Sequence, residues 1–172
     1  MKSLKSILEA VNVTPTSVKE TSSYTEIWWR DLGVKIKNKH QQPLIDGYLA
    51  SVLRKNWDDY DKNLELKEWE KPKYTLDRFS AYITQFGNNK PVIKLNVSGT
   101  GASDSFGSFN SVMAYILIEN PDKQKFTTDE LIEFCNKVID KLNNKTDKVI
   151  KFLAKGWNLP NEYTDYNEFL KL

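Results

Sequence analysis

Cysteine and histidine are almost missing from this sequence. Cys135 and His40 are the single residues of their kinds among 172. One cysteine excludes an intramolecular disulfide framework, and one cysteine with one histidine leaves too few ligands for a structural zinc site. The cysteine content therefore fits a reducing compartment, although it does not require one.

Long apolar runs and a strong excess of charge are missing as well. No apolar run approaches the about 20 residues that a membrane-spanning helix needs, so we expect a soluble or peripheral protein without a membrane partner. The formal net charge of +2 is too small to imply nucleic acid by itself. With 40% hydrophobic and 12% aromatic residues, the chain can bury one substantial core, which predicts a single domain.

The distribution of residue types predicts three parts. Residues 1–23 read as an N-terminal leader and linker, because residues 12–23 are rich in threonine, serine and proline. Residues 24–156 form the predicted domain, and residues 157–172 form a C-terminal arm that folds over the domain or reaches a neighbouring subunit. The predicted class is α+β: an antiparallel sheet of three to four strands packed against two main helices, with a leader helix and the arm.

Alternation and turn residues predict the strands. Residues 24–37 read as one long strand with a bulge at Gly33, or as a tight hairpin. The other predicted strands are residues 78–86, 91–98 and 110–119. Residues 87–90 suit a hairpin loop, and residues 98–108 read as a flexible loop, so a three-stranded meander is expected.

Two main helices are expected. The first has Pro43 in its first turn and a broad apolar face made by Leu44, Ile45, Tyr48, Leu49, Val52 and Leu53. The second starts at a capping box of Thr127 and Glu130 and runs to Gly156, with a weak point at Asn143 and Asn144. Its apolar stripe is Leu131, Cys135, Val138, Leu142, Val149 and Leu153.

The first ten residues form a basic amphipathic leader. Leu4, Ile7, Leu8 and Val11 share one face of a helix. The leader resembles the capsid-targeting leaders of internal head proteins in large contractile-tailed bacteriophages, which begin Met-Lys-(Ser/Thr) and are cut after an (Ile/Leu)-x-Glu triplet. The resemblance covers about a tenth of the chain. It implies a cut after Glu9 in the sequence Ile7, Leu8, Glu9, Ala10; the alternative is an ordinary N-terminal helix packed on its own domain.

One acidic segment is similar to a calcium-binding loop. Asp59, Asp61, Asn63 and Glu70 stand at the first, third, fifth and twelfth positions of an EF-hand pattern. Leu64 takes the place where that loop needs glycine, which favours the alternative of a solvated acidic helix end or loop. No cofactor is expected, with calcium as the minor alternative.

Catalytic patterns are weak, so no catalytic residue is predicted and an enzyme is the less favoured class. Gly99 and Gly101 lie in a glycine- and serine-rich stretch that lacks the lysine of a phosphate-binding loop, and we interpret it as a strand connection. Cys135 belongs to an apolar helix stripe and is expected to be a buried hydrophobe. His40 falls in a basic, polar connection away from any nucleophile.

Two sets of residues are candidates for binding. A basic face on the last helix, toward DNA or an acidic protein, would consist of Lys137, Lys141, Lys145, Lys148 and Lys155, with simple solvation as the alternative. Protein contacts are expected from Trp28, Trp29, Trp157, Tyr163, Tyr166 and Phe169. Trp28 and Trp29 are adjacent, so on a strand they must point to opposite faces.

These observations favour a structural or packaged protein of a tailed-phage virion that acts through contacts with other virion proteins or with itself. It would be located in the virion, and in the host cytoplasm during assembly. Nothing in the sequence specifically indicates nucleic acid, but the lysine-rich helix leaves a small DNA-associated or host-directed factor as an alternative. A metal-dependent hydrolase using the acidic segment is the second alternative.

Overall fold

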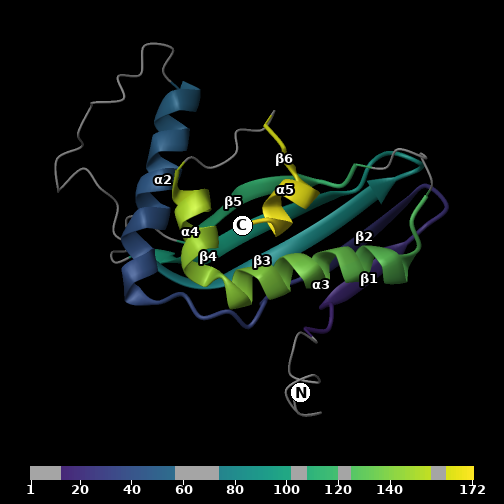
Figure 1. The fold of residues 1–172 in the computed structure, drawn as a ribbon, viewed down its shortest axis with the longest axis horizontal. Coiled ribbons are helices and arrows are strands. Elements are labelled where there is room, and N and C mark those ends of the chain that lie inside the picture. Colours follow the sequence, from purple (N-terminus) through teal and green to yellow (C-terminus); the bar gives the residue numbers. More distant parts are fainter. Residues whose placement is uncertain (1–12, 57–73, 102–107, 120–124, 156–161) are drawn as a thin grey trace.

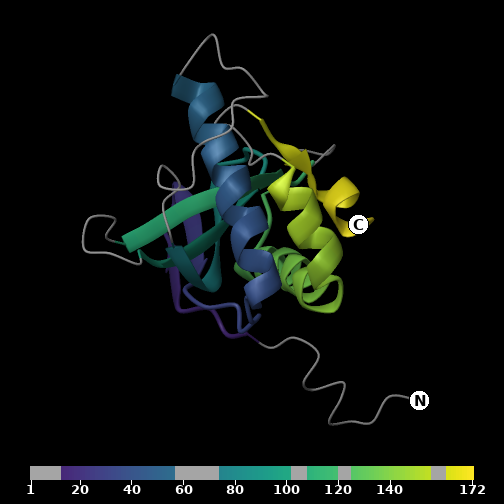
Figure 2. The same ribbon diagram turned by 90° about the vertical axis from the view of Figure 1, so that its left-hand side faces the viewer.

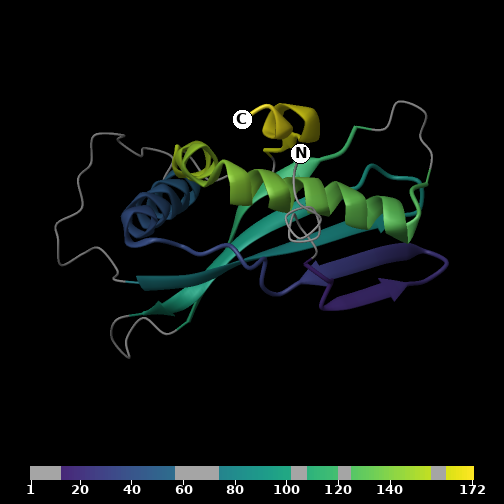
Figure 3. The same cartoon turned by 60° about the horizontal axis from the view of Figure 1, so that its bottom comes forward.

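A computed structural model describes residues 13–56, 74–101, 108–119, 125–155 and 162–172, which form an α+β fold. Six strands make one mixed sheet in which each strand lies beside its neighbour in the sequence. The described helices cover one face of this sheet, so the molecule has two layers (Figures 1 and 3). The α+β class is therefore confirmed, whereas the prediction of three to four strands is too low.

The strands are β1 (Ser17–Glu20), β2 (Tyr24–Trp29), β3 (Tyr74–Phe86), β4 (Val92–Gly101), β5 (Ser108–Leu117) and β6 (Thr164–Asp165). β1 to β5 pair antiparallel, and the short β6 pairs parallel with β5. β1 lies inside the segment predicted to be a linker, and β6 lies inside the predicted arm. Both strands are short. They are defined by their pairing with β2 and β5, and their own residues show no strand pattern.

The helices are α2 (Asn38–Asn56), α3 (Thr128–Asn144), α4 (Thr146–Ala154) and α5 (Tyr166–Leu170). The capping box at the start of α3 is present: the Thr127 hydroxyl accepts from the Glu130 amide, and the Glu130 carboxylate accepts from the Thr127 amide. The single long helix predicted from Thr127 to Gly156 is wrong in one respect. It divides at Lys145, directly after the expected weak point, and the Thr146 hydroxyl donates to the Leu142 carbonyl at 2.8 Å across the break.

The segment between β2 and α2 differs from the prediction. It is neither a continued strand nor a hairpin, because β2 ends at Trp29 and Gly33 turns the chain at a φ of 70°. The Leu32 amide donates to the Phe79 carbonyl at 3.0 Å. Leu32, Val34 and Ile36 are nevertheless buried. Their alternation therefore belongs to an extended segment that packs on the core without joining the sheet.

α2 begins at Asn38, so Pro43 lies inside the helix and not in its first turn, where the sequence predicts it. Tertiary hydrogen bonds hold the residues that precede the proline. The Gln41 side chain donates to the Leu76 carbonyl at 3.0 Å and accepts from the Leu76 amide at 2.7 Å, as a neighbouring strand would. Leu44 and Ile45 are buried as predicted.

The core lies between the sheet and the helices. Alternate strand residues such as Ile27, Ile83, Ile93 and Ile116 are fully buried on the helix side. From the helices, α3 contributes the predicted stripe, and α5 contributes Phe169, which is also fully buried. The C-terminal segment therefore folds over its own domain, which was one of the two alternatives left open for the arm.

Candidate functional site

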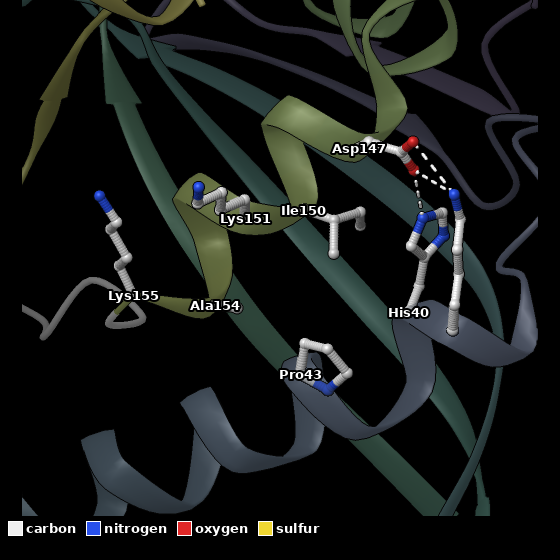
Figure 4. A pocket seen from close by; sticks show the side chains of 8 residues that line it. His40, Pro43, Asp147, Ile150, Lys151, Ala154 and Lys155 are labelled. Atoms are coloured by element: carbon white, nitrogen blue, oxygen red, sulfur yellow. Dashed lines mark hydrogen bonds and ion pairs between the residues drawn. The ribbon is translucent and has the colours of Figure 1, made fainter.

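A groove lies between α2 and α4, which run side by side (Figures 1 and 2). Its volume is about 420 Å³. Pro43 of α2 and Ile150 and Ala154 of α4 form its apolar part, and the ammonium groups of Lys151 and Lys155 lie along α4 (Figure 4). A cavity of this size falls in the range of small-molecule sites, so its polar groups decide what chemistry it can support.

His40 and Asp147 meet at one end of this groove. His40 Nε2 lies 2.8 Å from Asp147 Oδ1, and Lys39 Nζ lies 3.0 Å from the same carboxylate (Figure 4). The hydrogen bond from His40, and then that from Lys39, hold the pKa of Asp147 below its ordinary value of 3.8. Asp147 is therefore an anion at neutral pH, and His40 Nε2 must carry the proton that it shares with it.

The burial of His40 makes this pair a contact between two helices. His40 is only 4% exposed, and its second nitrogen, Nδ1, is buried without a hydrogen-bond partner among the described residues. Nε2 is occupied by Asp147 and Nδ1 is buried, so neither nitrogen is accessible to a ligand in the groove. Among the described residues, the lining of the groove has no hydroxyl or thiol side chain. His40 thus ties the start of α2 to the start of α4, and its predicted place in a polar connection is wrong.

Elsewhere in the described part of the chain, the structure shows neither an accessible cysteine nucleophile nor a cluster of metal ligands. Cys135 is fully buried, and this burial raises the pKa of its thiol well above the ordinary value. The described residues contain no group of three or more histidine, cysteine or acidic side chains that could hold a metal ion. The calcium candidates Asp59, Asp61, Asn63 and Glu70 lie outside the described residues, as do Trp157 and the processing candidates Ile7, Leu8, Glu9 and Ala10.

The other face of the sheet, which no described helix covers, has a different character (Figure 3). We call it the open face. The pairing places Trp28 of β2 opposite Tyr82 of β3, Tyr82 opposite Lys94 of β4, and Lys94 opposite Tyr115 of β5. Directly paired residues share one face, so these side chains form a continuous row across four strands. Tyr163 extends the row, since its ring lies 5.8 Å from that of Tyr115.

The members of this aromatic row contact one another. The rings of Trp28 and Tyr82 meet edge to face at 6.2 Å. Lys94 Nζ lies 5.7 Å from the Tyr82 ring and 5.8 Å from the Tyr115 ring, within cation–π range of both. Burial, followed by the hydrogen bond with Glu26, raises the pKa of Tyr82 to about 12, so this hydroxyl stays neutral.

The predicted aromatic contact residues divide between this face and the core. Trp28 is 40% exposed and Tyr163 is 52% exposed. Trp29, Tyr166 and Phe169 are buried inside the domain, so their proposed role in protein contacts is wrong. Strand alternation sends Trp29 to the helix side, and α5 uses Tyr166 and Phe169 to pack on α3 and α4.

The predicted basic face is spread over two helices, although Lys137, Lys141 and Lys145 line one shallow hollow together. Lys137 and Lys141 belong to α3, whereas Lys148 belongs to α4, beyond the break at Lys145. Lys137 lies 3.9 Å from Glu133, and Lys141 donates to the Leu172 carbonyl at 2.7 Å. Lys155 lies along the groove between α2 and α4.

Tyr82, Lys94 and Tyr115 were not singled out from the sequence. Alternation within each strand predicts that they avoid the core, but the row exists only through the register between strands.

Every helix in the described residues is too short or too polar to span a bilayer. In comparisons with known proteins, no family model, no curated protein and no solved structure matches the chain.

Proposed function

We propose that this protein is a structural or packaged component of a tailed-bacteriophage virion and works by binding other polypeptides rather than by catalysis. Its similarity to capsid-targeting leaders supports the location in the virion. An exposed edge of the sheet supports the mode of action. The partners would be a second copy of the chain or other virion proteins.

The edge strand β1 is the observation that carries this proposal. All four of its residues are exposed, and β2 is its one partner strand among the described residues. The Thr21 amide donates to the Tyr24 carbonyl at 2.8 Å. In an antiparallel ladder every second pair is hydrogen-bonded, so the bonded pairs along β1 are those of Lys19 and Ser17. Ser17 and Lys19 therefore direct their backbone groups toward β2, while those of Val18 and Glu20 point outward.

An outward row of amide and carbonyl groups is a template for another strand. Only a polypeptide backbone satisfies it along its length, as in complexes formed by strand addition. Val18 is 50% exposed at this edge, so an added strand would also bury its apolar side chain.

The Val18→Pro variant tests this mode of assembly. Proline removes the outward amide of Val18 but no hydrogen bond to β2, and a strand accepts its fixed φ at an edge. We expect the wild-type protein to self-associate in sedimentation velocity experiments and the proline variant to remain monomeric, with nearly unchanged thermal stability. The matched variant Val18→Ala keeps the amide and should associate, although more weakly. Self-association that survives the proline substitution would contradict assembly through β1, and a wild-type chain that stays monomeric would rule out a second copy of the chain as the partner.

The two alternatives from the sequence stay predictions. A DNA-associated role for the lysine-rich segment would have to use lysines that lie on two separate helices. A metal-dependent hydrolase would use acidic residues that lie outside the described part of the chain. Neither gains an observation comparable to the exposed β1 edge.

A further inference from the structure

We propose that the open face of the sheet is a binding site for single-stranded nucleic acid, with the aromatic row as its stacking platform. This site is separate from the β1 edge, so it goes beyond the function proposed above. It differs also from the lysine-rich helices, for which the sequence leaves DNA binding as an alternative.

The first argument is the supply of accessible rings. Trp28 and Tyr163 are 40% and 52% exposed, and Tyr82 and Tyr115 lie between them at intermediate exposure. From β2 to β5 the row crosses three strand spacings, or roughly 14 Å. Exposed rings on an antiparallel sheet with helices behind it are a recurring way to stack two or three unpaired bases.

The second argument is charge. Lys94 lies within the row, and Arg30 places its guanidinium 5.6 Å from the Trp28 ring. Arg78 is exposed on β3, where it pairs with Ser98 of β4. None of these three cations forms an ion pair with a carboxylate in the described residues, so their charge remains available to phosphates.

Rings together with unpaired cations favour single strands over the other polymers that a basic surface attracts. Duplex DNA has its bases stacked on one another, so it would use the cations but not the rings. An acidic protein would likewise satisfy the charges, whereas every nucleobase offers a planar face to a tryptophan or tyrosine.

Fluorescence anisotropy with a fluorescein-labelled oligothymidylate of about twelve nucleotides tests the site. We expect saturable binding at low salt by the full chain and a Kd raised roughly 5- to 150-fold in Trp28→Ala, the range that corresponds to the loss of one stacked base. Lys94→Gln should weaken binding and reduce the slope of log K against log salt concentration by about 0.7.

Two matched variants serve as controls. Val18→Ala removes an apolar side chain that is 50% exposed but lies on the helix side of the sheet with its pair Ile27, and Lys148→Gln removes an exposed lysine from α4. Both should bind the oligonucleotide as the wild type does. Thermal unfolding of each variant separates a loss of binding from a loss of fold.

Several results would overturn the proposal. These are no binding at low salt, equal affinity for a duplex of the same length, displacement of the oligonucleotide by an equal charge of polyglutamate, or sensitivity to Lys148→Gln but not to Trp28→Ala. Equal displacement by polyglutamate would identify the open face as a site for an acidic protein. None of these results would affect assembly through β1, which Val18→Pro tests separately.

Discussion

Gly99 shows how one residue fixes the geometry of the sheet. A Cβ atom at this position would lie 2.0 Å from the Thr75 carbonyl oxygen and 2.7 Å from Leu76 Cα, both backbone atoms of β3. The register between β3 and β4 shifts in this region, between Leu76 and Arg78. The glycine is therefore needed for a close approach of two strands, and the sequence interpretation of Gly99 to Gly101 as a loop is wrong because these residues belong to β4.

We predict that Gly99→Ala lowers the free energy of unfolding by at least about 3 kcal/mol, since backbone must move to relieve the overlap. Urea unfolding followed by circular dichroism measures this change. Gly87→Ala is the matched control: Gly87 has a φ of 56°, but no atom lies within 4 Å of the place that an added Cβ would take. It should lose only about 1 kcal/mol, the cost of the left-handed conformation. Equal losses in the two variants would contradict the steric explanation.

Asp147 predicts a pH dependence of stability. The hydrogen bonds from His40 and Lys39 lower the pKa of this carboxyl in the folded state below 3.8, its ordinary value. Its contribution to stability is therefore complete above pH 3.8 and is lost as the pH falls through the lower folded-state pKa. Wild type should unfold at a higher temperature than Asp147→Asn at neutral pH, and the difference should close in acid. A difference in Tm that does not change with pH would show that the charge of Asp147 is unimportant.

The burial of a single residue could be predicted where a local sequence pattern determines it. Its environment could not be predicted where a residue far away in the sequence determines it. The alternation of Trp28 and Trp29 required opposite faces, but which face is the core depends on the helices. The burial of Cys135 followed from the apolar stripe on its helix. The contact between His40 and Asp147 joins residues far apart in the sequence, so no local pattern indicated it.

At the scale of elements, the start of α3 depends on its capping box. Thr127→Ala removes the hydroxyl that accepts from the Glu130 amide, and we expect a loss of about 1 kcal/mol in the free energy of unfolding. Chemical denaturation of this variant and of Thr128→Ala provides the comparison. The Thr128 hydroxyl donates to Glu20 at 3.2 Å on the surface and caps nothing, so its removal should change stability by less than about 0.5 kcal/mol. A larger loss in Thr128→Ala than in Thr127→Ala would contradict the capping assignment.

Elements with strong local signals were predicted, and elements held by tertiary contacts were not. The capping box, the apolar stripe of α3 and the strands around residues 87–90 follow from sequence patterns. β1 and β6 are too short to have a pattern of their own. The first turn of α2 comes before Pro43, and there the Gln41 side chain bonds to the backbone of Leu76, a contact that the local sequence does not indicate. The helix is interrupted at Lys145, directly after the expected weak point, and the Thr146 hydroxyl bonds to the Leu142 carbonyl across the break.

At the scale of the whole molecule, the two layers separate stability from binding. The helices and one face of the sheet form the core, while the β1 edge and the open face remain exposed among the described residues (Figure 3). Both surfaces depend on the order and register of strands. The sequence identified Trp28 and Tyr163 as candidates for contacts, but it did not predict the row that joins them or the edge strand beside them.

The central claim, that this protein is a virion component, is tested most directly by intact mass and N-terminal sequence of the protein from purified phage particles. We predict that it is present in the particles and begins at Ala10, which the leader resemblance implies through a cut after Glu9. Presence with an intact Met1 would remove the cleavage but retain the location in the virion. Absence of the protein from particles, when it is abundant in the infected cell, would contradict the account.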